Sequence, residues 1–107
     1  MIRVYIASPY TNGDVAVNVK LQLDVAEQLI TLGFAPFAPL YYHFQHMAHP
    51  RPYTDWMTLC LEWLPVCNCV LRLGGKSPGA EQEVSVAEQI GLPVFYSIDS
   101  LRHYYGV

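Results

Sequence analysis

The order of its elements limits the fold of this chain more than any other feature, because short β-prone runs alternate with helical stretches. A strand, a helix and a second strand in succession form a crossover, which places the strands parallel in one sheet with helices on its faces. The strand-like runs are 4–7, 34–40, 67–73 and 92–96; the helical stretches are 14–32, 55–64 and 80–90, with a further helical turn expected in 98–105.

This pattern predicts a fold of the α/β class. A chain of 107 residues has room for one core, so we expect a single domain, residues 1–107. The alternation favours a flavodoxin-like three-layer α/β/α architecture with a four- or five-stranded parallel sheet. The expected strand order is 2-1-3-4, with any fifth strand next to the fourth.

Residues at the ends of these segments support the assignment. Asp14 precedes the first helical stretch, where a carboxylate can accept N–H groups of the first turn, and Gly33 follows it as a helix-ending glycine. Pro36 and Pro39 cannot donate to a neighbouring strand, so the second strand is expected at an edge of the sheet. Residues 41–53 are rich in Tyr, His and Pro and are expected to form a loop.

The composition is unusually apolar. Hydrophobic residues make up 52% of the chain and charged residues 14%, against about 25% charged in average soluble domains. This balance excludes a disordered chain and indicates a sheet buried on both faces, a subunit interface, or both. We expect a homodimer, with the helix over 54–64 as the contact through Trp56, Leu59 and Trp63.

Charge and apolar length exclude two classes of partner. The formal net charge is −3 and the six Lys and Arg residues stand singly, so no basic face is available for duplex nucleic acid. No apolar run approaches the roughly 20 residues of a membrane span, and no signal-peptide pattern follows Met1. Three cysteines do not form a disulfide framework, so a cytoplasmic protein with reduced thiols is expected.

Two turn-rich loops mark the expected site. In the order 2-1-3-4, the loops that leave the first and third strands face each other across one crevice, and these are 8–13 and 74–79. Ser77 and the amides that begin the next helix can hold an anion such as a phosphate. Glu83 is expected in the first turn, pointing into the crevice. The alternative is that Glu81 and Glu83 only offset the helix dipole.

Two motifs carry a resemblance to a known family. Val4–Tyr10, VYIASPY, resembles the opening strand and loop of the nucleoside 2-deoxyribosyltransferase-like superfamily. Ser77–Glu83, SPGAEQE, followed by Ala87 and Gly91–Val94, resembles its second motif, in which a Ser and a Gly precede a catalytic Glu. The short length is similar to that of small bacterial and phage relatives and of the 2′-deoxynucleoside 5′-monophosphate N-glycosidases. The order of elements agrees over most of the chain.

The resemblance implies an activity and a set of site residues. Glu83 matches the carboxylate nucleophile that attacks the anomeric carbon of a nucleoside, and Ser77 matches a serine that contacts the 5′-phosphate. The other substrate-binding residues that it implies are Tyr5, Ser8, Pro9, Tyr10 and Gly79. A carboxylate suits this chemistry because the cleavage of an N-glycosidic bond passes through an oxocarbenium-like transition state. The substrate would be a nucleoside or its 5′-monophosphate, with no cofactor.

One departure concerns the second acid. Relatives usually carry an Asp in the helix before the third strand, and Cys60 stands at that position here. Neither Asp55 nor Glu62 occupies the same helical position. Asp55 is retained as the candidate second catalytic residue, and the alternative is that it is the N-cap of its helix.

Other residue patterns favour plain interpretations. His43, His46 and His49 have no ligand-spaced Cys or carboxylate beside them, so a solvent-facing or substrate-covering loop is favoured over a metal site. Among the many aromatic residues of 41–63, one or two could stack on a base. Two functions remain open: an enzyme of N-glycosidic bonds, hydrolase or transferase, and a non-catalytic nucleotide-binding or sensor module on the same fold, as in groups related to phosphoribohydrolases and TIR-like proteins.

Overall fold

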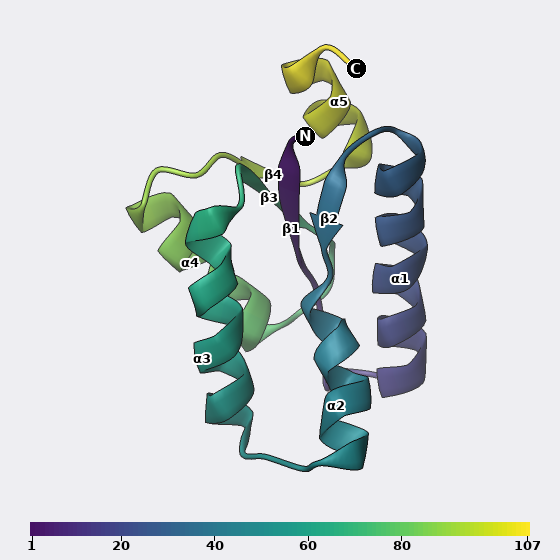
Figure 1. Ribbon diagram of the computed structural model, residues 1–107, viewed down its shortest axis with the longest axis vertical. Coiled ribbons are helices and arrows are strands. Elements are labelled where there is room, and N and C mark those ends of the chain that lie inside the picture. Colours follow the sequence, from purple (N-terminus) through teal and green to yellow (C-terminus); the bar gives the residue numbers. More distant parts are fainter.

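The computed structural model describes all residues, 1–107. One parallel sheet forms the centre of the fold, with its strands in the order β2-β1-β3-β4 (Figure 1). The strands are β1 (Arg3–Ala7), β2 (Ala35–Phe37), β3 (Cys69–Arg72) and β4 (Val94–Phe95). The helices are α1 (Val15–Thr31), α2 (Tyr42–Ala48), α3 (Tyr53–Trp63), α4 (Pro78–Gln89) and α5 (Ile98–Tyr105), with 3-10 turns η1 (Pro39–Tyr41) and η2 (Leu64–Val66). The flavodoxin-like α/β prediction is confirmed, with four strands. No stretch of helix has both the length and the apolar character that a bilayer crossing demands.

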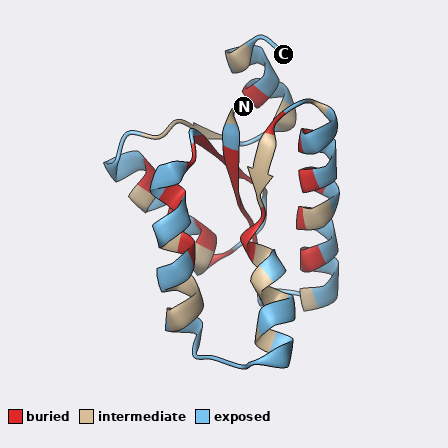
Figure 2. Cartoon of the chain, in the orientation of Figure 1, coloured by how far each residue is buried: buried red, intermediate tan, exposed pale blue.

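The sheet is buried on both faces because successive side chains of a strand point to opposite sides. Val4 and Ile6 of β1 join a cluster with residues of α1 and α5, whereas Tyr5 and Ala7 join a second cluster with residues of α3 and α4. Figure 2 shows this buried layer in the central strands and on the inward sides of the helices. The near-continuous apolar runs of β1 and β3 therefore have a core on each side.

The expected boundaries of α1 are confirmed. The Asp14 side chain accepts a hydrogen bond from the Val17 amide at 3.0 Å and caps the helix. Gly33 has a φ of 91°, in the left-handed region that glycine adopts without a steric penalty. β2 lies at the edge of the sheet, as its two prolines predict, but it ends at Phe37.

The prediction of a loop over 41–53 is wrong. Pro39 begins η1, where its fixed φ suits a helical start, and the chain continues directly into α2. None of the residues of α2 is buried, and the helix has only 7 residues, so its sequence shows no helical period long enough to be recognised. With α3 it forms a helical hairpin that extends beyond the carboxyl edge of the sheet (Figure 1).

The start of α4 also differs from the prediction. The helix begins at Pro78, with Ser77 as its N-cap, because proline fits the first helical position, where no N–H is needed. Glu81 is therefore the acidic residue of the first turn. Glu83 lies in the second turn and is buried.

Candidate active site

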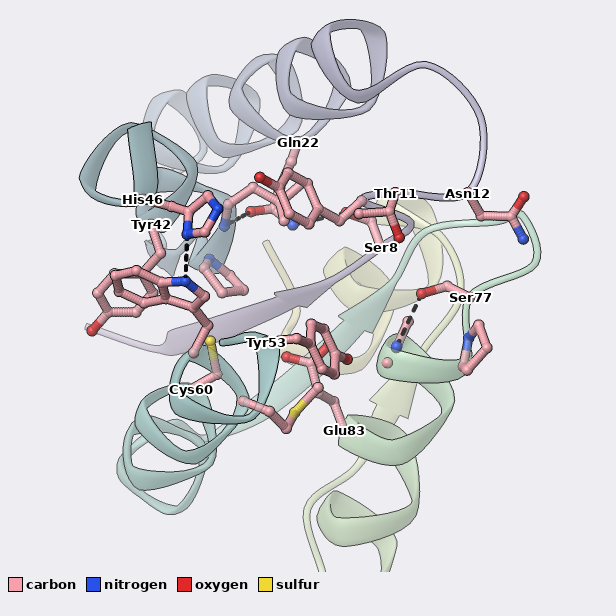
Figure 3. A pocket seen from close by; sticks show the side chains of 18 residues that line it. Ser8, Thr11, Asn12, Gln22, Tyr42, His46, Tyr53, Cys60, Ser77 and Glu83 are labelled. Carbon is pink, nitrogen blue, oxygen red and sulfur yellow. Dashed lines mark hydrogen bonds between the residues drawn. The ribbon is translucent and has the colours of Figure 1, made fainter. Parts of the chain in front are cut away.

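A cavity of about 340 Å³ lies where the loops after β1 and β3 meet α2, α3 and the start of α4 (Figure 3). The strand order brings these loops together, since β1 and β3 are neighbours. Figure 3 shows a polar end with Ser8, Thr11, Asn12 and Ser77, an opposite end with Tyr42, His46 and Cys60, and Glu83 and Tyr53 between them. The lining is completed by Tyr10, Gln22, Pro39, Leu40, Trp56, Met57, Pro78, Gly79 and Ala80.

Glu83 is the buried carboxyl group of this cavity, with 6% of its surface exposed. Burial raises its pKa to about 8, because a carboxylate loses hydration there. The Tyr5 hydroxyl donates a hydrogen bond to Glu83 Oε2. The interpretation of Glu83 as a solvated residue that offsets the helix dipole does not fit this burial.

Tyr5 does not line the cavity itself. It is fully buried, and its ring stacks on Phe37 of β2 with centroids 5.5 Å apart. It faces the α3 and α4 side of the sheet by the alternation of β1, which directs its hydroxyl to Glu83. Tyr5 therefore contacts the carboxyl group rather than the space where a ligand would lie.

Gln22 holds the polar end of the cavity in place, a role that was not predicted from the sequence. It is fully buried in α1, its Nε2 donates to Ser8 Oγ at 2.7 Å, and its Oε1 accepts from the Leu40 amide at 2.8 Å. The Ser8 hydroxyl thus accepts from Gln22 and keeps its own proton for a ligand. The sequence did contain a signal for this role, because Gln22 is a polar residue on the apolar stripe of the predicted 14–32 helix.

The loop before α4 supplies further donors. Ser77 is buried, and its hydroxyl oxygen accepts from the Ala80 amide at 3.1 Å, which leaves the hydroxyl proton free. Pro78 has no N–H, so the Gly79 amide is the remaining unpaired donor of this turn. A Cβ on Gly79 would lie 2.5 Å from the Tyr53 hydroxyl, so the glycine permits the close approach of this ring.

Arg72 fixes the glycine-rich loop, a role that the sequence analysis also missed. It is 6% exposed, and its guanidinium donates to the carbonyls of Leu73 and Gly75 and to Glu81 Oε1, the last at 3.0 Å from Nη2. An arginine presents donors in a rigid fork, which suits three acceptors in different directions. Glu81 therefore pairs with Arg72 across the loop that carries Ser77.

The opposite end of the cavity is aromatic. Trp56 and Tyr42 lie with ring centroids 5.3 Å apart, and the Trp56 indole N–H donates to His46 Nδ1 at 2.9 Å. Trp56 was predicted at a dimer contact, but it lines the cavity instead. Aromatic surface of this kind can stack on a flat ring.

The loop after β1 divides between cavity and core. Tyr10 lines the cavity, and its hydroxyl forms a hydrogen bond with His43 Nδ1 at 2.6 Å. Pro9 is buried but does not line the cavity; its ring lies against Gly75, where a Cβ would be 2.9 Å from Pro9 Cγ. Asn18 of α1 donates to the carbonyls of Tyr10 and Asn12 and so holds the loop.

Asp55 does not reach the cavity. Its carboxylate lies 3.4 Å from Arg51 on the surface, where the side chain is 44% exposed. The N-cap interpretation is wrong as well, because α3 begins at Tyr53 and Pro52 occupies the cap position. Cys60, in contrast, lines the cavity, and burial raises the pKa of its thiol to about 11, so this position carries no negative charge at neutral pH.

Residues 2–97 match a family model described as a domain of unknown function, DUF7768. The chain belongs to this family. No curated protein sequence matches this DUF7768 chain. Its fold is similar to that of a 2-deoxyribosyltransferase from Bacillus psychrosaccharolyticus, with 22% sequence identity and a TM-score of 0.61 over 86% of this chain and 69% of that one.

The site of this DUF7768 domain has two chemically different ends. Hydroxyl and amide donors gather at one end, aromatic rings at the other, and one buried carboxyl group lies between (Figure 3). None of the lining residues is Lys or Arg. No group of three or more His, Cys, Asp or Glu side chains is placed to hold a metal ion, and the three histidines of 43–49 form no such cluster.

Proposed function

We propose that this protein cleaves the N-glycosidic bond of a nucleoside or of its 5′-monophosphate, or transfers the glycosyl group to a second base, with Glu83 as the nucleophile. The observation that carries the proposal is the position of Glu83, a buried carboxyl group between an aromatic and a hydroxyl-rich end of one cavity. The fold shared with a 2-deoxyribosyltransferase supports the same chemistry.

In this proposal the substrate spans the cavity. The base stacks at the Trp56 end, and the 5′ end of the sugar receives hydrogen bonds from the hydroxyls of Ser8 and Ser77 and from the Gly79 amide. The anomeric carbon then lies beside Glu83. A 5′-phosphate would be held by these neutral donors and the start of α4, since no cationic side chain lines the cavity.

The covalent step uses the ionised form of Glu83. A carboxylate oxygen bonds to C1′, the C1′–N bond breaks, and its electron pair passes to the leaving base. The Tyr5 hydroxyl donates to Oε2 and so favours the ionised form against the cost of burial. Water resolves the glycosyl-enzyme in a hydrolase, and a second base resolves it in a transferase.

A second candidate is a non-catalytic nucleotide-binding module. Cys60 supplies a neutral thiol at the position where the resemblance implies an Asp, and the raised pKa of Glu83 keeps much of this group protonated at pH 7. Such a module would bind nucleotides in the same cavity and release no base. The two candidates differ in turnover, not in binding.

The test is incubation with a panel of nucleosides and 5′-monophosphates, with free base measured by chromatography. Glu83→Gln keeps the size of the side chain and removes its charge, so base release should fall by about 10²–10³-fold while nucleotide binding is retained. Glu88→Gln is the matched control, because Glu88 is exposed on the same helix. Base release by Glu83→Gln at the wild-type rate would contradict the nucleophile role, and binding without turnover by the wild type would favour the second candidate.

We also infer a homodimer. The α2 and α3 hairpin carries exposed apolar side chains, which include Phe44 (51% exposed), Met47 (67%), Leu59 (40%) and Trp63 (47%). A second copy of the chain would remove this surface from water.

A further inference from the structure

The hydrogen bonds around His46 fix which of its ring nitrogens carries the proton. Nδ1 accepts from the Trp56 indole N–H at 2.9 Å and from the Arg51 amide at 3.2 Å. Both partners are donors only, so Nδ1 holds no proton and the neutral ring carries its proton on Nε2. His46 lines the cavity at the aromatic end, in the part of the site where the proposed function places the base.

The proposed reaction leaves an electron pair on the departing base, and few groups of the cavity can stabilise it. Asp55 lies outside the cavity, and Cys60 offers only a buried thiol, a weak donor. Trp56 already donates its indole N–H to His46.

The tyrosine hydroxyls do not serve this end either. Tyr10 forms a hydrogen bond with His43, and the Tyr53 hydroxyl lies against Gly79. The Tyr42 hydroxyl accepts a hydrogen bond from the indole N–H of Trp63, a residue that does not line the cavity. The Nε2–H group of His46 is thus the well-placed donor that remains at the aromatic end.

We propose that His46 donates its Nε2–H to an acceptor atom of the leaving base and thereby stabilises the charge that develops as the C1′–N bond breaks. This inference rests on the proposed function. It names a further catalytic residue and a substrate class: bases with a lone pair, on a ring nitrogen or a carbonyl oxygen, at the edge that faces α2.

His46 acts here as a neutral hydrogen-bond donor and keeps its proton. Nδ1 accepts from the Trp56 indole and the Arg51 amide, so Nε2–H is the donor that the ring offers. The electron pair of the broken bond therefore stays on the base, which takes its proton from water after it leaves. A neutral imidazole can stabilise developing negative charge in this way.

The test compares two variants on two kinds of leaving group. In His46→Asn the amide oxygen takes the place of Nδ1 and still accepts from Trp56, but no donor replaces Nε2–H. In His46→Gln an amide N–H lies near the Nε2 position. Release of a natural base should fall about 10- to 100-fold in His46→Asn and recover in part in His46→Gln. Release of 4-nitrophenol from its 2-deoxyriboside, which departs without assistance, should stay within about threefold of wild type in both.

Three outcomes separate this inference from the proposed function. An equal loss on both leaving groups would show that His46 is only structural and would overturn the inference while base release stands. Wild-type protein that releases neither product refutes the proposed function, and binding then decides the inference. In that case free adenine should bind to the wild type about tenfold more tightly than to His46→Asn. Adenine analogues with C–H in place of ring nitrogen 3 or 7 then identify the acceptor atom, because the analogue that lacks this atom should bind equally to the two proteins. Equal binding of every base by the two proteins would overturn it.

Discussion

At the scale of a single residue, the ionisation of Glu83 sets the pH dependence of the proposed reaction. Burial raises the pKa of this carboxyl group to about 8, and only the carboxylate can attack C1′. We expect kcat/KM for base release to rise about tenfold per pH unit below pH 8 and to level above it. Rates measured across this range on the free enzyme test it. A rate that is constant through neutral pH would contradict an ionising nucleophile.

The same raised pKa has a consequence for stability. The folded protein keeps a proton on Glu83 that the unfolded chain loses near the ordinary pKa of 4.5. The contribution of this group to the free energy of unfolding is therefore fully present below pH 4.5 and is lost as the pH rises to about 8. Glu83→Gln removes this titration. We expect the variant to gain stability relative to wild type between pH 5 and pH 8, on the order of 2–4 kcal/mol, in denaturant unfolding. A difference that does not change with pH would contradict the burial cost, and Glu88→Gln should show no such trend.

At the scale of elements, Gln22 connects α1, the end of β1 and η1 through its hydrogen bonds to Ser8 and to the Leu40 amide. Gln22→Leu should lower the free energy of unfolding by about 2–4 kcal/mol, because it leaves buried polar groups without partners. Nucleotide binding should weaken as well, since Ser8 loses its orientation. Gln28→Leu, at an exposed position of the same helix, is the control, and an equal effect of the two substitutions would contradict this role.

The helices also differ in how well they could be predicted from the sequence. α1 carries an apolar stripe, a capping Asp14 and a terminal Gly33, so its boundaries follow from local chemistry. α2 has only 7 residues, none of them buried, and lies among prolines and histidines, so its sequence shows no helical period. The part of the candidate site that α2 contributes, including His46, was for that reason the hardest to predict.

At the scale of the whole molecule, the apolar surface of the α2 and α3 hairpin predicts self-association. Light scattering at micromolar concentration should give the mass of a dimer. Leu59→Lys should shift the mass toward the monomer, because Leu59 is 40% exposed on α3 and a buried lysine charge is costly. Leu21→Lys, at a position 46% exposed on α1, should leave the dimer intact. A wild-type monomer would contradict the interface.

The α/β class, the strand order and the loops that meet at the carboxyl edge of the sheet could all be predicted from the amino-acid sequence. These follow from periodicity, caps and turn residues, which act between near neighbours, and from the handedness of parallel crossovers. Which side chains contact one another could be seen only in the folded chain. The bond from Tyr5 to Glu83, the bond from Trp56 to His46 and the surface position of Asp55 depend on how separate elements pack against one another. Packing brings together residues that are distant in the chain, and local sequence patterns do not predict such contacts.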